Sequence, residues 1–343
     1  MEPRHHRHNN YWDAIYDPLI DLSNFKKIDY DELKNNTGPQ YMLFDISQIG
    51  NTIVDIEDIT FKQCDIYGEN NGLRINFKNC TFIKVFFGYS IFNNVKFQNC
   101  TFNHSSFSMA QFNNCQFINC KFQNVSFAGN ETIFKNTIIH AEDIIKSGYT
   151  NLDENVLSQK ATSVEYQISR FEKTKAKFAK MLVSSLANTT DDDLYYNAIK
   201  TYLICRSKAR IEDFKLEART HSKNILRSLL FSIKAKVAVV ELGIIRASGF
   251  INNWGNGLFR AMSFGLLLIL SFTLYYYMIY GTSFVGGLIK SIDITFLAGY
   301  TKHVTTKTPT LQQIIMLLNM SLGLWWYAIM IPTLINRICN IRQ

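Results

Sequence analysis

Phenylalanine recurs at every fifth position through a long stretch of the first half of the chain, without a miss. A period of five is neither the roughly 3.6-residue period of an α-helix nor the roughly two-residue period of a β-strand. It predicts a coil that turns a corner every five residues and points each aromatic ring inward. The series consists of Phe77, Phe82, Phe87, Phe92, Phe97, Phe102, Phe107, Phe112, Phe117, Phe122 and Phe127.

A second position of the repeat supports the same coil. The residue two places before each phenylalanine is small or apolar, and the other three positions are mostly Asn, Gln, Lys, Thr and Ser. Two inward and three outward positions in each unit predict a dry axis and a square cross-section. An insertion near residues 68–72 separates these units from looser ones that keep the spacing, namely Val54/Ile56, Ile59/Phe61 and Cys64/Ile66.

This pattern resembles the pentapeptide-repeat family, whose solenoid is a right-handed quadrilateral β-helix. The resemblance implies a solenoid over residues 51–140, preceded by an N-terminal extension or cap over residues 1–50. Each coil buries its face only against its neighbours, so several coils must stack. Five of the seven cysteines occupy the small inward position. We expect buried, reduced thiols and no metal or cofactor, because no cysteine or histidine cluster has zinc spacing.

The composition changes after the repeats, and residues 141–250 are predicted to form a cytosolic helical connector. Residues 163–185 have helical spacing, and a second helix is expected to start near Thr190, where three aspartates follow. Residues 226–248 are apolar but include the charged residues Lys234, Lys236, Glu241 and Arg246, which is typical of a helix lying on a membrane surface. The second helix has an apolar stripe made of Leu194, Ala198, Tyr202, Cys205 and Ala209.

Residues 251–343 contain two uncharged segments, 261–289 and 308–336. Each is long enough to cross the roughly 30 Å hydrocarbon core of a bilayer. Arginines flank both outer ends, and the first ten residues are basic and lack the apolar stretch of a signal peptide. We therefore expect a multi-pass protein of the bacterial inner (cytoplasmic) membrane with both termini in the cytoplasm.

The stretch between these segments resembles the pore loop of the potassium-channel superfamily. Residues 291–301 (SIDITFLAGYT) resemble a pore helix followed by a filter, and a Gly-Tyr pair matches the family's filter motif. The filter differs from the family pattern, most notably at Lys302, which stands where the family has an aspartate. The resemblance implies a hinge at Gly323, a kink at Pro332, and pore-lining residues Thr295, Leu297, Ala298, Gly299, Tyr300 and Thr301.

The combined resemblance implies an ion-channel-like homotetramer that conducts monovalent cations such as potassium. In that interpretation the cytosolic solenoid binds a protein or ligand partner and gates the pore. The alternative is a membrane-anchored scaffold with a non-conducting transmembrane hairpin. No nucleic-acid partner is expected: residues 70–130 lack the acidic residues of a DNA mimic, and the aromatic rings point inward. No enzyme is expected, because the sequence contains no phosphate-binding glycine loop or catalytic motif.

Overall fold

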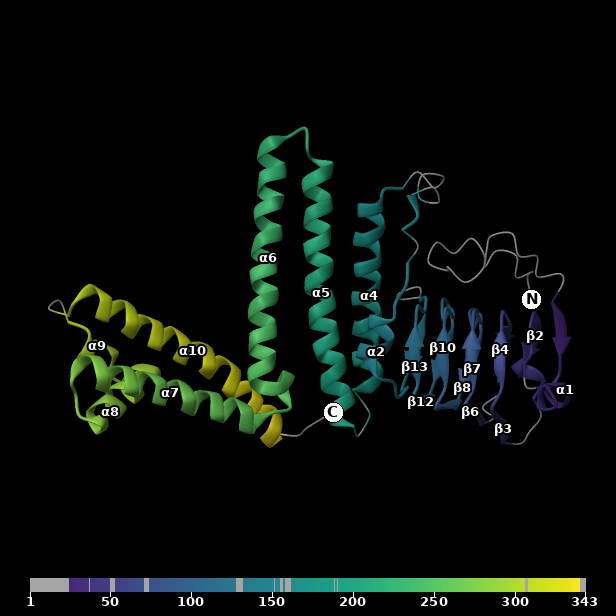
Figure 1. Cartoon of the computed structure of the whole chain (residues 1–343), viewed down its shortest axis with the longest axis horizontal. Helices are drawn as coiled ribbons and strands as arrows, with labels where there is room; N and C mark the ends of the chain where they lie inside the picture. Colours follow the sequence, from purple (N-terminus) through teal and green to yellow (C-terminus); the bar gives the residue numbers. More distant parts are fainter. Residues whose placement is uncertain are drawn as a thin grey trace. The chain divides into compact units, whose positions relative to one another are not determined.

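The computed structural model describes residues 25–339 except positions 37, 50–52, 71–73, 128–131, 151, 155–156, 158–161, 188, 190 and 306–307. The chain divides into two compact units, Met1–Gly243 and Ile244–Gln343, which are described one at a time. Figure 1 shows a stack of short strands followed by helices in the first unit and long helices in the second.

The first unit begins with a β-solenoid of about five turns, whose strands form four parallel sheets. Each coil contributes one short strand or bridge to each side, which gives the square cross-section predicted from the repeat. The sheets are β1 (Lys26–Ile28), β2 (Met42–Asp45) and β5 (Asp65–Tyr67); β4 (Thr60–Lys62), β7 (Thr81–Ile83), β10 (Thr101–Asn103) and β13 (Lys121–Gln123); β8 (Ile91–Asn93), β11 (Gln111–Asn113) and β14 (Ile133–Lys135); and β3 (Val54–Glu57), β6 (Ile75–Lys78), β9 (Lys96–Gln98) and β12 (Gln116–Ile118).

Equivalent phenylalanines of successive coils lie opposite one another. Phe82 pairs with Phe102, and Phe77 pairs with Phe97, so one coil takes four units of five residues. Phe61 pairs with Phe82, one residue out of that spacing, which confirms the register change predicted near residues 68–72. The ladder also includes β1 and β2, which lie inside the segment predicted as an extension or cap.

The phenylalanine core predicted from the sequence is confirmed. Eight consecutive members of the series, from Phe77 to Phe112, have no exposed surface, and Phe122 is half-buried in the last coil. Rings stack along the solenoid axis: the centroids of Phe97 and Phe117 are 4.7 Å apart, and those of Phe82 and Phe102 are 4.8 Å apart. Each coil therefore covers the aromatic face of the next.

Asparagine sets the corners of the coils. Residues in the left-handed region recur two places after each phenylalanine from Phe77 to Phe122, for example Asn94, Asn99 and Asn114 with φ of 57°, 56° and 53°. Asparagine tolerates this region better than most residues, because its short amide bonds locally. Along one corner the amides also bond to each other, since Asn99 Nδ2 donates to Asn79 Oδ1 at 3.3 Å. The polar repeat positions thus fix the turns.

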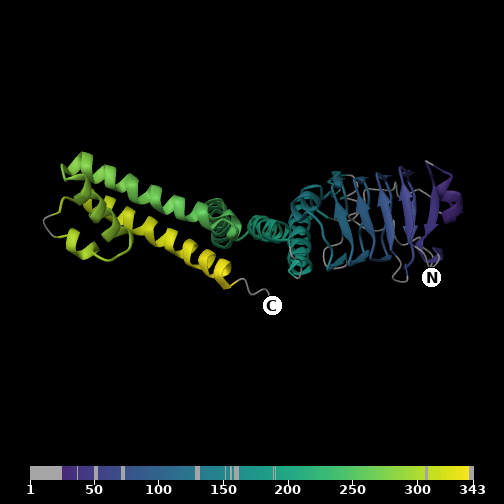
Figure 2. The same ribbon diagram turned by 90° about the horizontal axis from the view of Figure 1, so that it is seen from below.

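Helices close both ends of the solenoid. At the N-terminal end are α1 (Tyr30–Lys34) and the 3-10 helix η3 (Ile46–Gln48), with Leu33 fully buried. At the other end α2 (Ala141–Lys146) and α4 (Val164–Leu186) continue the same hydrophobic core, and Figure 2 shows α4 against the last coils. Phe178 of α4 stacks on Phe127 with a centroid distance of 4.4 Å.

The remaining helices of the connector follow the predicted pattern. Helix α5 (Asp192–Thr220) begins after Asp191, whose side chain accepts a hydrogen bond from the backbone N–H of Leu194, and it packs along α4. The predicted stripe faces α4, with Ala198, Cys205 and Ala209 buried. Helix α6 (Ile225–Asn252) starts in the first unit and ends in the second.

The second unit holds two long apolar helices and a short one. These are α7 (Leu258–Tyr280), α8 (Phe284–Thr295) and α10 (Thr310–Cys339), together with the 3-10 helix η5 (Asn253–Gly255) and the single-turn helix α9 (Tyr300–His303). Gly281 ends α7 in the left-handed conformation with φ 59°. Among the described residues, Leu258–Tyr280 and Thr310–Ile335 are long and apolar enough to cross a membrane.

Candidate functional site

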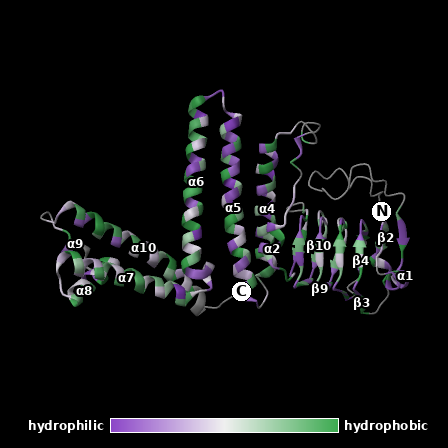
Figure 3. Cartoon of the chain, viewed as in Figure 1, coloured by the Kyte–Doolittle hydropathy of each residue, from purple (hydrophilic) through white to green (hydrophobic). Residues whose placement is uncertain are grey.

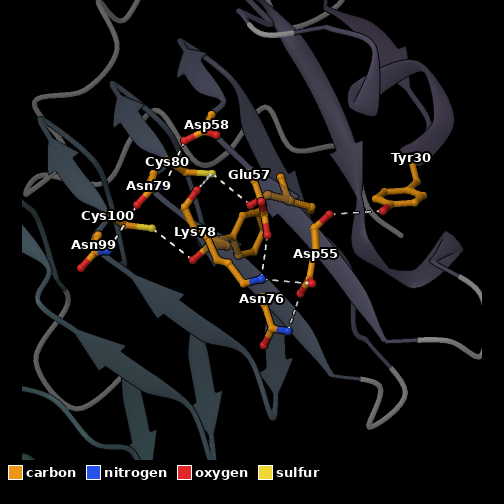
Figure 4. A network of polar contacts seen from close by, with 12 residues as sticks. Tyr30, Asp55, Glu57, Asp58, Asn76, Lys78, Asn79, Cys80, Asn99 and Cys100 are labelled. Carbon is orange, nitrogen blue, oxygen red and sulfur yellow. Dashed lines mark hydrogen bonds and ion pairs between the residues drawn. The ribbon is translucent and has the colours of Figure 1, made fainter.

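The N-terminal coils carry a compact charge network on one outer side of the solenoid (Figure 4). Lys78 Nζ lies 3.1 Å from an Asp55 carboxylate oxygen and 2.6 Å from one of Glu57. The Asn76 amide also donates to Asp55 at 2.6 Å. These hydrogen bonds from Asn76 and Lys78 lower the pKa of Asp55. The network joins neighbouring coils and neutralises Lys78.

Beyond that network the outer sides of the solenoid are polar and basic. Residues 70–130 contain no aspartate or glutamate. Lys84 and Lys121 are exposed and Lys96 is half-buried, each projecting outward between rows of Asn, Gln and Thr. One such row, on the sheet that ends with β13, consists of Thr60, Thr81 and Thr101 in register. These sides offer hydrogen-bond donors, acceptors and positive charge.

An open cavity of about 520 Å³ lies where the last coils meet α2. Lys121, Gln123 and Asn124 line it from β13 and the following corner, and Asp143 and Lys146 line it from α2. This cavity could not be predicted from the sequence, because nothing in the repeat indicates where α2 returns to the solenoid.

The solenoid cysteines are inward-facing thiols, as predicted. Cys115 Sγ donates to the carbonyl oxygen of Phe92 at 3.3 Å, and burial raises the pKa of the Cys115 thiol to about 12. The described residues contain no group of histidine, cysteine, aspartate or glutamate side chains that would hold a metal ion. Cys64, Cys80 and Cys100 are buried like Cys115, and these four thiols pack and donate hydrogen bonds rather than react. Cys120 differs, because it is partly exposed and a hydrogen bond with Cys100 lowers its pKa.

A buried polar chain joins the three main helices of the second unit. Thr295 Oγ1, at the end of α8, donates to Asn319 Oδ1 of α10 at 2.9 Å, and Asn319 Nδ2 donates to the Tyr276 hydroxyl of α7 at 3.2 Å. Ser291 Oγ donates to the carbonyl oxygen of Ile269 at 2.8 Å. All of these side chains except that of Ile269, which contributes only its backbone, are buried. These hydrogen bonds hold α8 between α7 and α10.

The predicted filter residues follow α8 in a turn. Leu297 has φ 59° and an exposed side chain, and the Gly299 N–H donates to the Asp293 carbonyl at 3.1 Å. The backbone then enters α9 at Tyr300 instead of running extended. His303 Nε2 lies 3.0 Å from Asp293 Oδ2, which ties this turn back to α8.

The structure therefore brings together only part of the predicted pore set. Thr295 is buried against α10, whereas Leu297, Ala298 and Gly299 form the turn. The backbone of Tyr300 and Thr301 is helical, and their side chains lie outside the described residues. The pore-lining role of the set stays a prediction.

Gly323 and Pro332 both lie inside the continuous helix α10. A Cβ atom on Gly323 would come within 2.4 Å of the Thr295 carbonyl oxygen. Glycine at this position therefore allows α8 to approach α10, a role in packing that is separate from the predicted hinge. About one turn further along α10, Trp326 Nε1 donates a hydrogen bond to the Ala261 carbonyl oxygen of α7 at 2.7 Å. Its indole ring lies against Gly265 of α7, where a Cβ atom would come within 2.2 Å of the ring.

Comparison with known proteins agrees with the solenoid. The family model for pentapeptide repeats matches residues 90–129 in eight copies. No curated protein matches the chain. The family match and the four-sided stack of parallel strands together identify the first part of the chain as a pentapeptide-repeat β-solenoid, a fold consistent with a role in protein interaction.

Proposed function

We propose that this protein is a membrane-anchored interaction protein. In this proposal α7 and α10 cross a bilayer as a hairpin, and the pentapeptide-repeat solenoid binds a protein partner on the cytosolic side. The observation that carries the proposal is the apolar surface that α7 and α10 leave exposed on the sides facing away from each other. It includes Leu266, Leu267, Leu274, Ile314, Leu317 and Leu324.

The distribution of polar groups in this unit fits a bilayer. The hydroxyl and amide side chains of Thr273, Ser291, Thr295 and Asn319 are buried between the helices and hydrogen-bonded there. Without water in the hydrocarbon core, polar groups must be satisfied inside the protein. Figure 3 shows the apolar character along α7 and α10.

Insertion is tested by extracting membranes that contain the full chain with alkaline carbonate. We expect the protein to stay in the membrane fraction. Replacing Leu266, Leu267 and Leu270, all exposed on α7, with lysine should release it, since a lysine near the centre of a span costs about 2.5–3.5 kcal/mol. A matched triple change to lysine at the exposed solenoid residues Asn94, Asn114 and Gln123 should not release it. Release of the unaltered protein would contradict the proposal.

The charge of the solenoid favours a partner with an acidic surface. A photoreactive residue at Gln98, beside Lys96 on the sheet that contains β9, should cross-link to such a partner in cells. Lys96→Glu should abolish that product, whereas Lys180→Glu, which makes the same change of charge on an exposed site of α4, should not. Equal yields from both variants would remove the electrostatic basis of the proposed binding.

Ion conduction by a homotetramer is the second candidate function. One observation favours it: a short helix, α8, is packed between two candidate spans by buried hydrogen bonds. Flux from liposomes, compared for potassium, sodium and chloride, tests it with Gly299→Asp as the control. Flux that Gly299→Asp abolishes would support a pore at residues 298–301. No flux from a verified oligomer would leave the anchor as the function of this unit.

A further inference from the structure

Helix α6 carries an apolar surface with no partner in the part of the chain that the structure describes. We call it the α6 stripe, and its six side chains are 50–80% exposed. The opposite side of α6 packs against α5, where Ala238 and Leu242 contact Ile211 and Phe214. The stripe consists of Leu226, Leu229, Leu230, Ile233, Val237 and Val240.

The stripe is one continuous surface. Successive members are one, three or four residues apart, which places all six on one side of an α-helix within an arc of roughly 100°. At about 1.5 Å per residue the stripe is roughly 20 Å long. Large contiguous apolar patches are rare on soluble monomers and mark interaction or membrane surfaces.

Basic residues border the stripe. Lys236 lies next to it on one edge, and Lys234 and Arg227 lie beyond the other, all exposed. The acidic residue on this part of α6, Glu241, is paired with α5. Both of its carboxylate oxygens accept hydrogen bonds from Arg210, at 2.7 and 2.8 Å. The border of the stripe is therefore positive, which complements anionic lipid headgroups.

The other end of α6 lies beside the candidate spans. In the second unit, Trp325 Nε1 donates to Ser248 Oγ at 3.1 Å, and Asn252 Nδ2 donates to Thr333 Oγ1 at 3.1 Å. Ile251 is buried in a cluster near the start of α7 and the end of α10. If α7 and α10 span a bilayer, the C-terminal turns of α6 are therefore held at the boundary of that bilayer.

We propose that the α6 stripe inserts into the interface of a bilayer that contains anionic lipids, with its basic border on the headgroups. This inference rests on the membrane anchoring proposed above. Amphipathic helices with a basic polar face bury their apolar face about 5–10 Å into the headgroup and acyl boundary. Pairing with a second α6 is disfavoured, because lysines and arginines at both edges would face their own copies.

The full chain is reconstituted in vesicles of phosphatidylcholine, with or without phosphatidylglycerol, and a photoreactive residue replaces Val237. We expect cross-links to lipid, with a yield several-fold higher when phosphatidylglycerol is present. The matched control replaces Lys215, an exposed residue of α5, and should give no lipid product. A product joining two copies of the chain at position 237, or a lipid yield no higher than at position 215, would overturn the proposal.

A second variant separates this inference from the anchoring proposal. Ile233→Lys with Val237→Lys changes exposed side chains on the face of α6 opposite α5, so folding should be unaffected. We expect the variant to stay in the carbonate-resistant fraction through α7 and α10, while the protection of α6 from hydrogen exchange by anionic lipid is lost. Loss of carbonate resistance by the unaltered chain would contradict the anchoring proposal alone. Unchanged protection of α6 in the variant would contradict the α6 stripe proposal alone.

Discussion

The substitution Phe178→Ala tests whether α4 is a structural cap of the solenoid. Phe178 has no exposed surface, and its ring lies 4.4 Å from that of Phe127 and 5.4 Å from that of Phe134, measured between centroids. Truncating a buried phenylalanine to alanine costs about 3–5 kcal/mol. The last coils have no further coil to cover them, so the loss should fall on them and on α4 together.

Hydrogen exchange of the detergent-solubilised full chain measures the effect locally. A loss of about 3 kcal/mol corresponds to exchange faster by more than about 100-fold in peptides that contain β12, β14 and α4. Tyr166→Ala on the same helix removes an exposed ring and should change exchange less than about threefold. Combining Phe178→Ala with Phe127→Ala should cost less than the sum of the two single changes, because the rings are in contact.

A result that confined the faster exchange to α4 would refute the reasoning. It would mean that the helices fold beside the solenoid without sharing its core. A cost below about 1 kcal/mol would refute it as well.

Three further predictions concern single residues. Burial alone would raise the pKa of Glu142, but hydrogen bonds from Lys146 and Lys200 lower it from its ordinary 4.5 to about 2, so the stabilising contribution of Glu142 is complete above about pH 4.5 and is lost as the pH falls toward 2. Glu142→Gln should lower the free energy of unfolding, measured by urea titration at neutral pH, by about 1–3 kcal/mol and should flatten its dependence on acid pH. An unchanged acid dependence would contradict this role of Glu142. Gly323→Ala should lower the free energy of unfolding by about 1–3 kcal/mol in a thermal unfolding assay, because α8 must move away from α10. Gly243→Ala, with open space around the new methyl group, should leave stability unchanged or raise it. Equal effects of the two changes would argue against the close approach of α8 to α10. Cys115 should be alkylated by iodoacetamide at about pH 8 at least a thousandfold more slowly in the folded chain than after denaturation, since its thiol is buried with a raised pKa, and comparable rates would show that the solenoid opens.

The solenoid was predictable because its physical constraint repeats in the sequence. Each inward phenylalanine makes the same stack with the next coil, so the period of five appears directly in the residues. A corner every five residues was predicted for the same reason, whereas its positive φ, often at Asn, is seen only in the structure. The first strands of the solenoid could not be predicted, because β1 and β2 pair without the phenylalanine repeat.

The contacts made by the connector and the second unit depend on residues far apart in the chain. Phe178 resembles any apolar residue of an amphipathic helix, and only the fold shows that it stacks on Phe127. Likewise, the polar contact between Asp293 and His303 connects a helix to the turn at the predicted filter, and only the fold shows it. Sequence patterns indicated the helices correctly but did not indicate which surfaces they cover.

The most direct test of the central claim is the topology of the chain in intact bacterial cells. A cysteine replaces Thr305, in the segment between the candidate spans, or Gln123, on the solenoid, and a membrane-impermeant maleimide is added outside. We predict labelling at position 305 in intact cells, and labelling at position 123 only after the membrane is broken. Labelling of both positions alike, before and after disruption, would contradict a solenoid anchored by a transmembrane hairpin.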